Sequence, residues 1–128
     1  MKKYFLAAFL FIFILPAFFS NVKAATFVVT NTGDSNAVGS GSLRRAILDA
    51  SAANTNDIIE FDPVVFATPQ TITLINSGLT ITNFNFNDLG SLTINGRNVV
   101  TVTRSSAGGT PQFGIFRIEN AAIINNLT

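Results

Sequence analysis

The chain contains no cysteine and no histidine. Without cysteine there is no disulfide framework, and without histidine the commonest general base and metal ligand of proteins are missing. Charge is also sparse, because only eight Lys and Arg residues stand against seven Asp and Glu residues in 128 positions. The basic surface of a nucleic-acid-binding protein is therefore not expected. We predict that the protein uses no cofactor, no metal ion and no nucleic-acid partner.

Only one long apolar run is present, and it lies at the N-terminus. Two lysines precede the apolar residues 5–15, Pro16 breaks the run, and Val22 and Ala24 are short side chains two positions apart. These are the parts of a secretory signal peptide, so we predict that residues 1–24 are removed by cleavage after Ala24. The alternative, a retained membrane anchor, needs about 20 uninterrupted apolar residues. The sequence thus predicts a secreted or cell-surface protein.

Cleavage would change the charge of the chain. The lysines Lys2, Lys3 and Lys23 all lie in the removed segment, which leaves five arginines against the seven acidic residues. The net charge would then be −2 in place of +1. Contact with a membrane is expected only through the signal peptide during export.

The remaining sequence is typical of β-structure. β-Branched residues are abundant, and apolar residues alternate with Thr or Asn in short runs that turn residues separate. We therefore predict a single all-β domain. The clearest runs are residues 71–74, 79–82, 92–95 and 100–103, and a further alternation covers residues 83–87.

The apolar pairs of these runs recur at intervals of about 20 residues, which is a spacing typical of a solenoid. Stacked coils of a parallel β-helix would bury such pairs as continuous rows. We expect two columns. The first holds Ile72/Leu74, Leu92/Ile94 and Phe116/Ile118, and the second holds Ile59/Phe61, Leu79/Ile81, Val100/Val102 and Ala122/Ile124.

One segment predicts a short helix over about residues 42–53. Ser42 is a suitable N-cap, and the next apolar residues follow at spacings of three and four: Leu43, Ala46, Ile47 and Ala50. Asn54 is a plausible stop. A helix at the start of a solenoid can cover the open apolar end of the first coil, so we expect a capping role. A binding role for the helix is the alternative.

Several segments resemble one known family. The stretch from Gly39 to Ile47, GSGSLRRAI, together with DIIEFDP, TPQTITL and LTING, is similar to the opening of bacterial right-handed parallel β-helix repeat proteins. These carry an N-terminal segment often written CSLREAI or GSLRQAI, and Arg45 stands where they have Glu or Gln. The resemblance implies a large, adhesin-like surface or secreted protein with further coils after Thr128, of which this chain is an N-terminal fragment.

The resulting domain organisation has three parts. Residues 1–24 form the signal peptide, residues 25–57 form a cap of one strand and the helix, and residues 58–128 form the first two to three coils of the β-helix. The expected function is that of a non-enzymatic scaffold that contacts an extracellular glycan or a surface protein.

An enzymatic alternative depends on the acidic residues Asp57, Glu60 and Asp62, which cluster around one predicted strand. Paired carboxylates on the outer face of a β-helix could serve a polysaccharide lyase or glycosidase, or hold calcium. A solvated edge is the simpler interpretation, so no catalytic residue is assigned. Two other acids, Asp88 and Glu119, stand elsewhere, and Asp34 is interpreted as a turn residue.

Threonine and asparagine dominate the polar positions. We expect the threonines to face outward as an uncharged surface that could bind carbohydrate or ice, or simply be solvated: Thr73, Thr80, Thr82, Thr93, Thr101 and Thr103. We expect the asparagines at the strand ends to stack at the corners and to tolerate left-handed backbone: Asn83, Asn95, Asn98 and Asn125.

Overall fold

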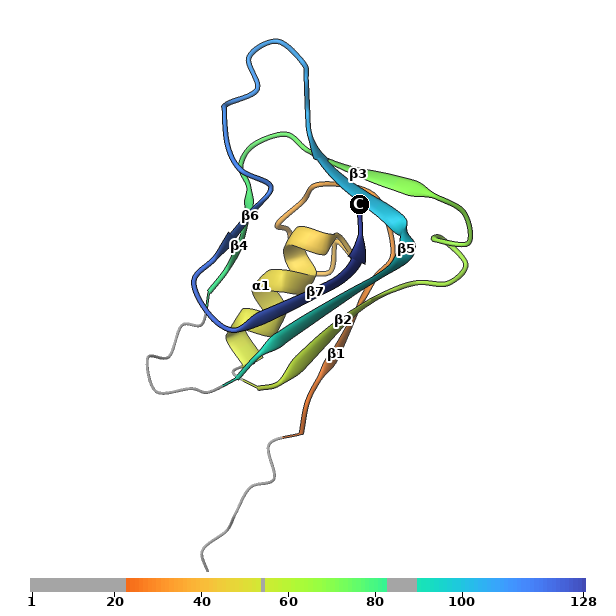
Figure 1. The fold of residues 1–128 in the computed structure, drawn as a ribbon, viewed down its shortest axis with the longest axis vertical. Coiled ribbons are helices and arrows are strands. Elements are labelled where there is room, and N and C mark those ends of the chain that lie inside the picture. Colours follow the sequence, from red (N-terminus) through yellow and green to blue (C-terminus); the bar gives the residue numbers. More distant parts are fainter. Residues whose placement is uncertain (1–22, 54, 83–89) are drawn as a thin grey trace, which may run out of the picture.

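The computed structural model describes residues 23–53, 55–82 and 90–128 (Figure 1). Most of the predicted signal peptide, the predicted helix stop at Asn54 and the alternation over residues 83–87 lie outside the described residues. The elements are β1 (Thr26–Val29), α1 (Leu43–Ala53), β2 (Asp57–Phe61), β3 (Gln70–Leu74), β4 (Leu79–Ile81), β5 (Leu92–Arg104), β6 (Phe116–Ile118) and β7 (Ala122–Leu127).

Every strand pair of the described residues is parallel. One sheet has the order β1-β2-β5-β3, with β7 also paired to β5, and a second sheet joins β4 to β6. The parallel strands curl around α1, which is the one helix of the described residues (Figure 1). The prediction of a mostly-β chain with one short helix is therefore confirmed.

The strand register differs from the predicted columns. Ile59 pairs with Ile94 rather than with Leu79, and Ile94 pairs with Ile124 rather than with Ile118. Similarly, Ile72 pairs with Val102 rather than with Leu92. The predicted number of residues between two paired strands is too small. The chain forms three sides of a coil before it returns to the side on which it began. Alternation defines which face of a strand is apolar, but it does not define how far the chain travels before it pairs again.

The corner within β5 replaces a predicted break between two strands. Residues 92–94 pair with β2, residues 100–104 pair with β3, and the segment between them turns from one side of the coil to the next. Arg97 and Asn98 have φ angles of 57° and 62°, in the left-handed region. The expectation that Asn98 tolerates left-handed backbone is confirmed.

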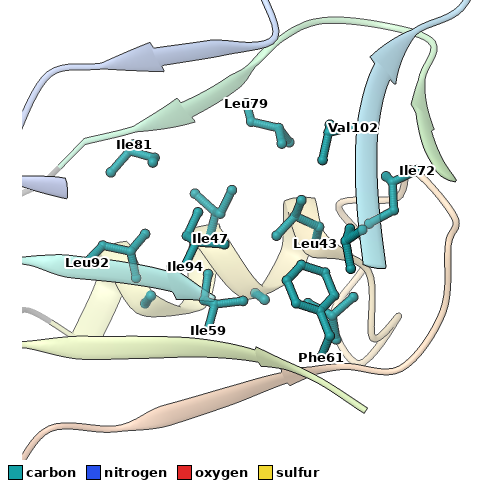
Figure 2. Close-up of a cluster of buried hydrophobic side chains, with 14 of the residues drawn as sticks. Leu43, Ile47, Ile59, Phe61, Ile72, Leu79, Ile81, Leu92, Ile94 and Val102 are labelled. Atoms are coloured by element: carbon teal, nitrogen blue, oxygen red, sulfur yellow. The ribbon is translucent and has the colours of Figure 1, made fainter. Parts of the chain in front are cut away.

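The core consists of the inward residues of the strands and the apolar face of α1 (Figure 2). The inward assignments for β2, β3, β4 and β5 are confirmed, since all ten predicted residues are buried. Those for the last coil are not, because Ile118 is 52% exposed and Phe116, Ala122 and Ile124 are only partly buried. The last coil thus covers the core of the coil beneath it while its own apolar side chains stay partly open.

The helix begins as the sequence predicts. The hydroxyl oxygen of Ser42 accepts a hydrogen bond from the backbone N–H of Arg45 at 3.1 Å, the geometry of an N-cap. Leu43 and Ile47 point into the core and are 0% and 1% exposed. Because α1 packs against β1, β2 and β4, it fills the space that the first coil encloses. No helix of the described residues is long and apolar enough to cross a membrane.

Candidate functional site

The acidic residue Asp57 does not belong to a solvated edge. It opens β2 with its side chain turned inward, and the residue is only 1% exposed. The Oδ1 atom accepts hydrogen bonds from the backbone N–H of Ala25, at 2.9 Å, and from the hydroxyl of Thr55. The other oxygen, Oδ2, is buried and has no hydrogen-bonding protein group in the described structure. This carboxylate therefore anchors the segment that leads into β1.

The two neighbouring acids have separate surroundings. Asp62 follows β2, and its Oδ1 atom accepts hydrogen bonds from the N–H groups of Val64 and Val65 at 2.8 and 3.0 Å, which closes a turn. Glu60 lies on the outward face of β2, beside Val28 of β1. The structure thus gives Asp57, Glu60 and Asp62 three different environments and does not assemble them into one site.

The remaining acids do not complete such a site either. Glu119 is exposed and pairs with Arg117 at 2.6 Å, and Asp88 lies outside the described residues. Among residues 23–53, 55–82 and 90–128, no group of three or more acidic residues could hold a metal ion.

Asp34 is more than the turn residue that the sequence predicts. Its side chain is 2% exposed and accepts hydrogen bonds from Arg44 Nε at 2.6 Å and Nη2 at 3.2 Å. Asp34 Oδ2 also accepts from the N–H of Ile75 at 2.9 Å. Arg44 in turn donates to the carbonyl oxygens of Ser77 and Gly78 at 2.7 and 3.0 Å. This ion pair joins the loop before α1 to the turn between β3 and β4.

The second arginine of the helix makes a more exposed contact. Arg45 donates to Asp49 four residues later, which is one helical turn along α1. This hydrogen bond raises the pKa of the Arg45 guanidinium above its ordinary value. The sequence does not distinguish the buried pair from the exposed one, because the partners of Arg44 lie in distant loops.

Threonines form an ordered outward surface on the side built from β3 and the second half of β5. Thr71 pairs with Thr101 and Thr73 pairs with Thr103, so the side chains stand side by side on neighbouring coils. The N–H of Thr128 donates to Val100 O, and the N–H of Val102 donates to Thr128 O, which puts Thr128 beside Thr101. Neighbouring strands are about 4.8 Å apart. A rank of threonines, which we call the threonine rank, therefore crosses three coils: Thr71, Thr101 and Thr128, with Thr73 and Thr103 beside it.

The other predicted threonines do not join this surface. Thr80 is exposed on β4, on a different side of the coil, where it pairs with Arg117. Thr93 lies on the side formed by β2 and the first half of β5, and Thr82 follows β4.

Asparagines stack at one corner, as the sequence predicts. Asn95 of β5 and Asn125 of β7 are in register. The side-chain amide of Asn126 donates to Asn95 Oδ1 at 3.5 Å, and Asn126 itself has a left-handed φ of 57°. Asn83 lies outside the described residues. These contacts align the corners of successive coils, which is a structural role.

Comparison with protein-family models, with curated proteins and with solved structures gave no match for this chain. What the chain does is therefore inferred from its own geometry.

Proposed function

We propose that this chain is the beginning of a secreted or cell-surface right-handed parallel β-helix that serves as a non-enzymatic, adhesin-like scaffold. The main support for this proposal is the threonine rank, which gives three successive coils a regular, uncharged, hydroxyl-bearing side. Uniformly parallel pairing around a helix-filled first coil supports the β-helix. The resemblance of the GSLRRAI segment to surface β-helix proteins supports the same function.

The proposal includes export with cleavage after Ala24 and further coils after β7. Partial exposure of Phe116, Ala122 and Ile124 supports the further coils, because the equivalent positions one coil earlier, such as Leu92 and Ile94, are buried. One more coil on β7 would bury these side chains and would pair its open edge.

An extracellular glycan is the proposed ligand of the threonine rank. The test is binding of the purified protein to a panel of surface polysaccharides. We expect the double variant Thr101→Lys/Thr103→Lys to bind about tenfold more weakly, because bulky charges would disrupt the rank. The matched control is Thr80→Lys, which puts the same side chain on an exposed threonine of a different side.

Equal weakening by the Thr80→Lys control would contradict a role for the threonine rank. The same panel also tests the enzymatic alternative, a polysaccharide lyase or glycosidase. Glycan cleavage that is lost in Glu60→Gln would overturn the scaffold proposal.

A further inference from the structure

We propose that the α-amino group released by cleavage after Ala24 binds the buried carboxylate of Asp57, so that signal-peptide removal fixes β1 on the sheet. This inference depends on the cleavage site in the proposed function, but it does not depend on the glycan ligand. The cleavage step breaks the amide bond between the carbonyl carbon of Ala24 and the nitrogen of Ala25, and water supplies a hydroxyl to that carbon and a proton to that nitrogen. At neutral pH that nitrogen takes up a further proton and becomes an ammonium.

The position of Ala25 supports the proposal. Its nitrogen lies 2.9 Å from Asp57 Oδ1, and its carbonyl oxygen accepts a hydrogen bond from the N–H of Ile58 at 2.9 Å. Lys23 and Ala24, the two residues before it, are exposed. The predicted cleavage site therefore coincides with the point where the chain changes from exposed to held by the sheet.

The charge of Asp57 supports it as well. A carboxylate that is 1% exposed needs a positive partner or several donors to offset the free-energy cost of its burial. In the uncleaved chain Ala25 offers one neutral N–H, and Oδ2 receives no hydrogen bond from the described protein groups. An ammonium would supply three N–H donors and a positive charge at the same position.

Asp57 borders a hollow of about 20 Å³. None of the other residues that line this hollow is charged, among them Ser51, Ser91 and Asn120. The last turn of α1, to which Ser51 belongs, has no basic residue that would offset the negative end of the helix dipole. That negative end therefore also favours a positive group. Of the other acids, Glu60 faces outward, Asp49 is paired with Arg45, and Glu119 is paired with Arg117.

The composition of the mature chain makes the ion pair testable by pH. Residues 25–128 contain no Lys, His, Cys or Tyr, so the α-amino group is their only group that titrates between about pH 6 and pH 11. Its ordinary pKa is about 8, and the Asp57 carboxylate raises that pKa in the folded state. The stabilisation is therefore fully present below about pH 8 and is lost as the pH rises through the higher, folded-state pKa.

The experiment compares two forms of the purified protein, one that begins at Ala25 and one that begins at Ala24. The second form adds a residue without an ionisable side chain and moves the ammonium away from Asp57. We expect the Ala25 form to melt roughly 5 °C higher at pH 6.5, and we expect the difference to vanish by about pH 10.5. In the Asp57→Asn background the two forms should melt together at both pH values.

A second measurement uses the Ala25 form without any substitution. Because residues 25–128 have no lysine, an amine-reactive acetylating reagent modifies only the α-amino group, and mass spectrometry gives its rate. In the folded Ala25 form we expect acetylation at least tenfold slower than in urea. Equal melting of the two forms, or equal acetylation rates, would overturn the ion pair.

N-terminal sequencing of the exported protein tests the maturation step separately. An N-terminus other than Ala25 would overturn the link to export, and Ala25 at that position would support it. A failure to bind glycan would bear only on the proposed ligand.

Discussion

At the scale of single residues, the largely buried polar groups bind partners that lie elsewhere in the sequence. Asp34 and Arg44 are 10 residues apart. Arg44 also reaches across the fold to Ser77 and Gly78, and Ala25 and Asp57 are 32 residues apart. The sequence shows which residue types can carry charge, but contacts of this length do not follow from local spacing. For this reason Asp34 is predicted as a turn residue, and Asp57 as part of a solvated edge.

The Asp34–Arg44 pair gives a prediction at this scale. Replacement Asp34→Ala should lower the free energy of unfolding by about 3 kcal/mol, because it leaves Arg44 largely buried without its carboxylate and frees the N–H of Ile75. Urea unfolding of the purified protein measures the change. The control is Asp49→Ala, which removes the partner of the more exposed Arg45 and should change stability little. If both variants lost the same stability, burial of the first pair would not matter.

At the scale of the elements, the local pattern predicts most of what is observed. Alternation of apolar and polar residues locates β2 to β5, and the spacing of three and four together with Ser42 locates α1. The alternation of apolar and polar residues does not predict the register between strands. Pairing depends on the number of sides per coil and on loop lengths, and neither is encoded in a short strand.

The corner at Gly96 gives a prediction at the element scale. A Cβ atom there would lie 2.4 Å from the carbonyl oxygen of Asn126 and 2.4 Å from a methyl group of Leu127, both in the strand that stacks on this corner. Gly96→Ala should therefore lower the free energy of unfolding by about 2 kcal/mol, because β7 must move away. Gly108→Ala is the control, since a Cβ atom at that glycine would contact nothing within 4 Å. Unchanged stability of the Gly96 variant would mean that β7 does not pack there.

At the scale of the whole molecule, the coils differ in how many neighbouring strands they have and in how well their apolar residues are buried. The strands β2 and β5 have neighbours on both edges, whereas β7 pairs only with β5 among the described residues. The inward apolar residues also become more exposed from the first coil to the last, where Ile118 is 52% exposed. This gradient is consistent with a stack that is filled by α1 at one end and open at the other.

Hydrogen exchange measures this gradient. Amides of β2 should exchange most slowly, and those of β7 at least tenfold faster, because local opening of an edge strand breaks fewer contacts. Peptide-resolved exchange of the purified protein, followed by mass spectrometry, gives both rates. Protection of β7 equal to that of β2 would show that something already covers the last coil.

The order of the strand pairs has a consequence for how the chain reaches this structure. Each strand pairs with strands of the coil before it or after it, so the structure can be built in the order in which the chain is synthesised. Residues 26–61 already contain β1, α1 and β2, which pair or pack with one another before β5 is needed. Folding can therefore proceed from the N-terminal end as the polypeptide emerges, with each completed coil serving as the template for the next.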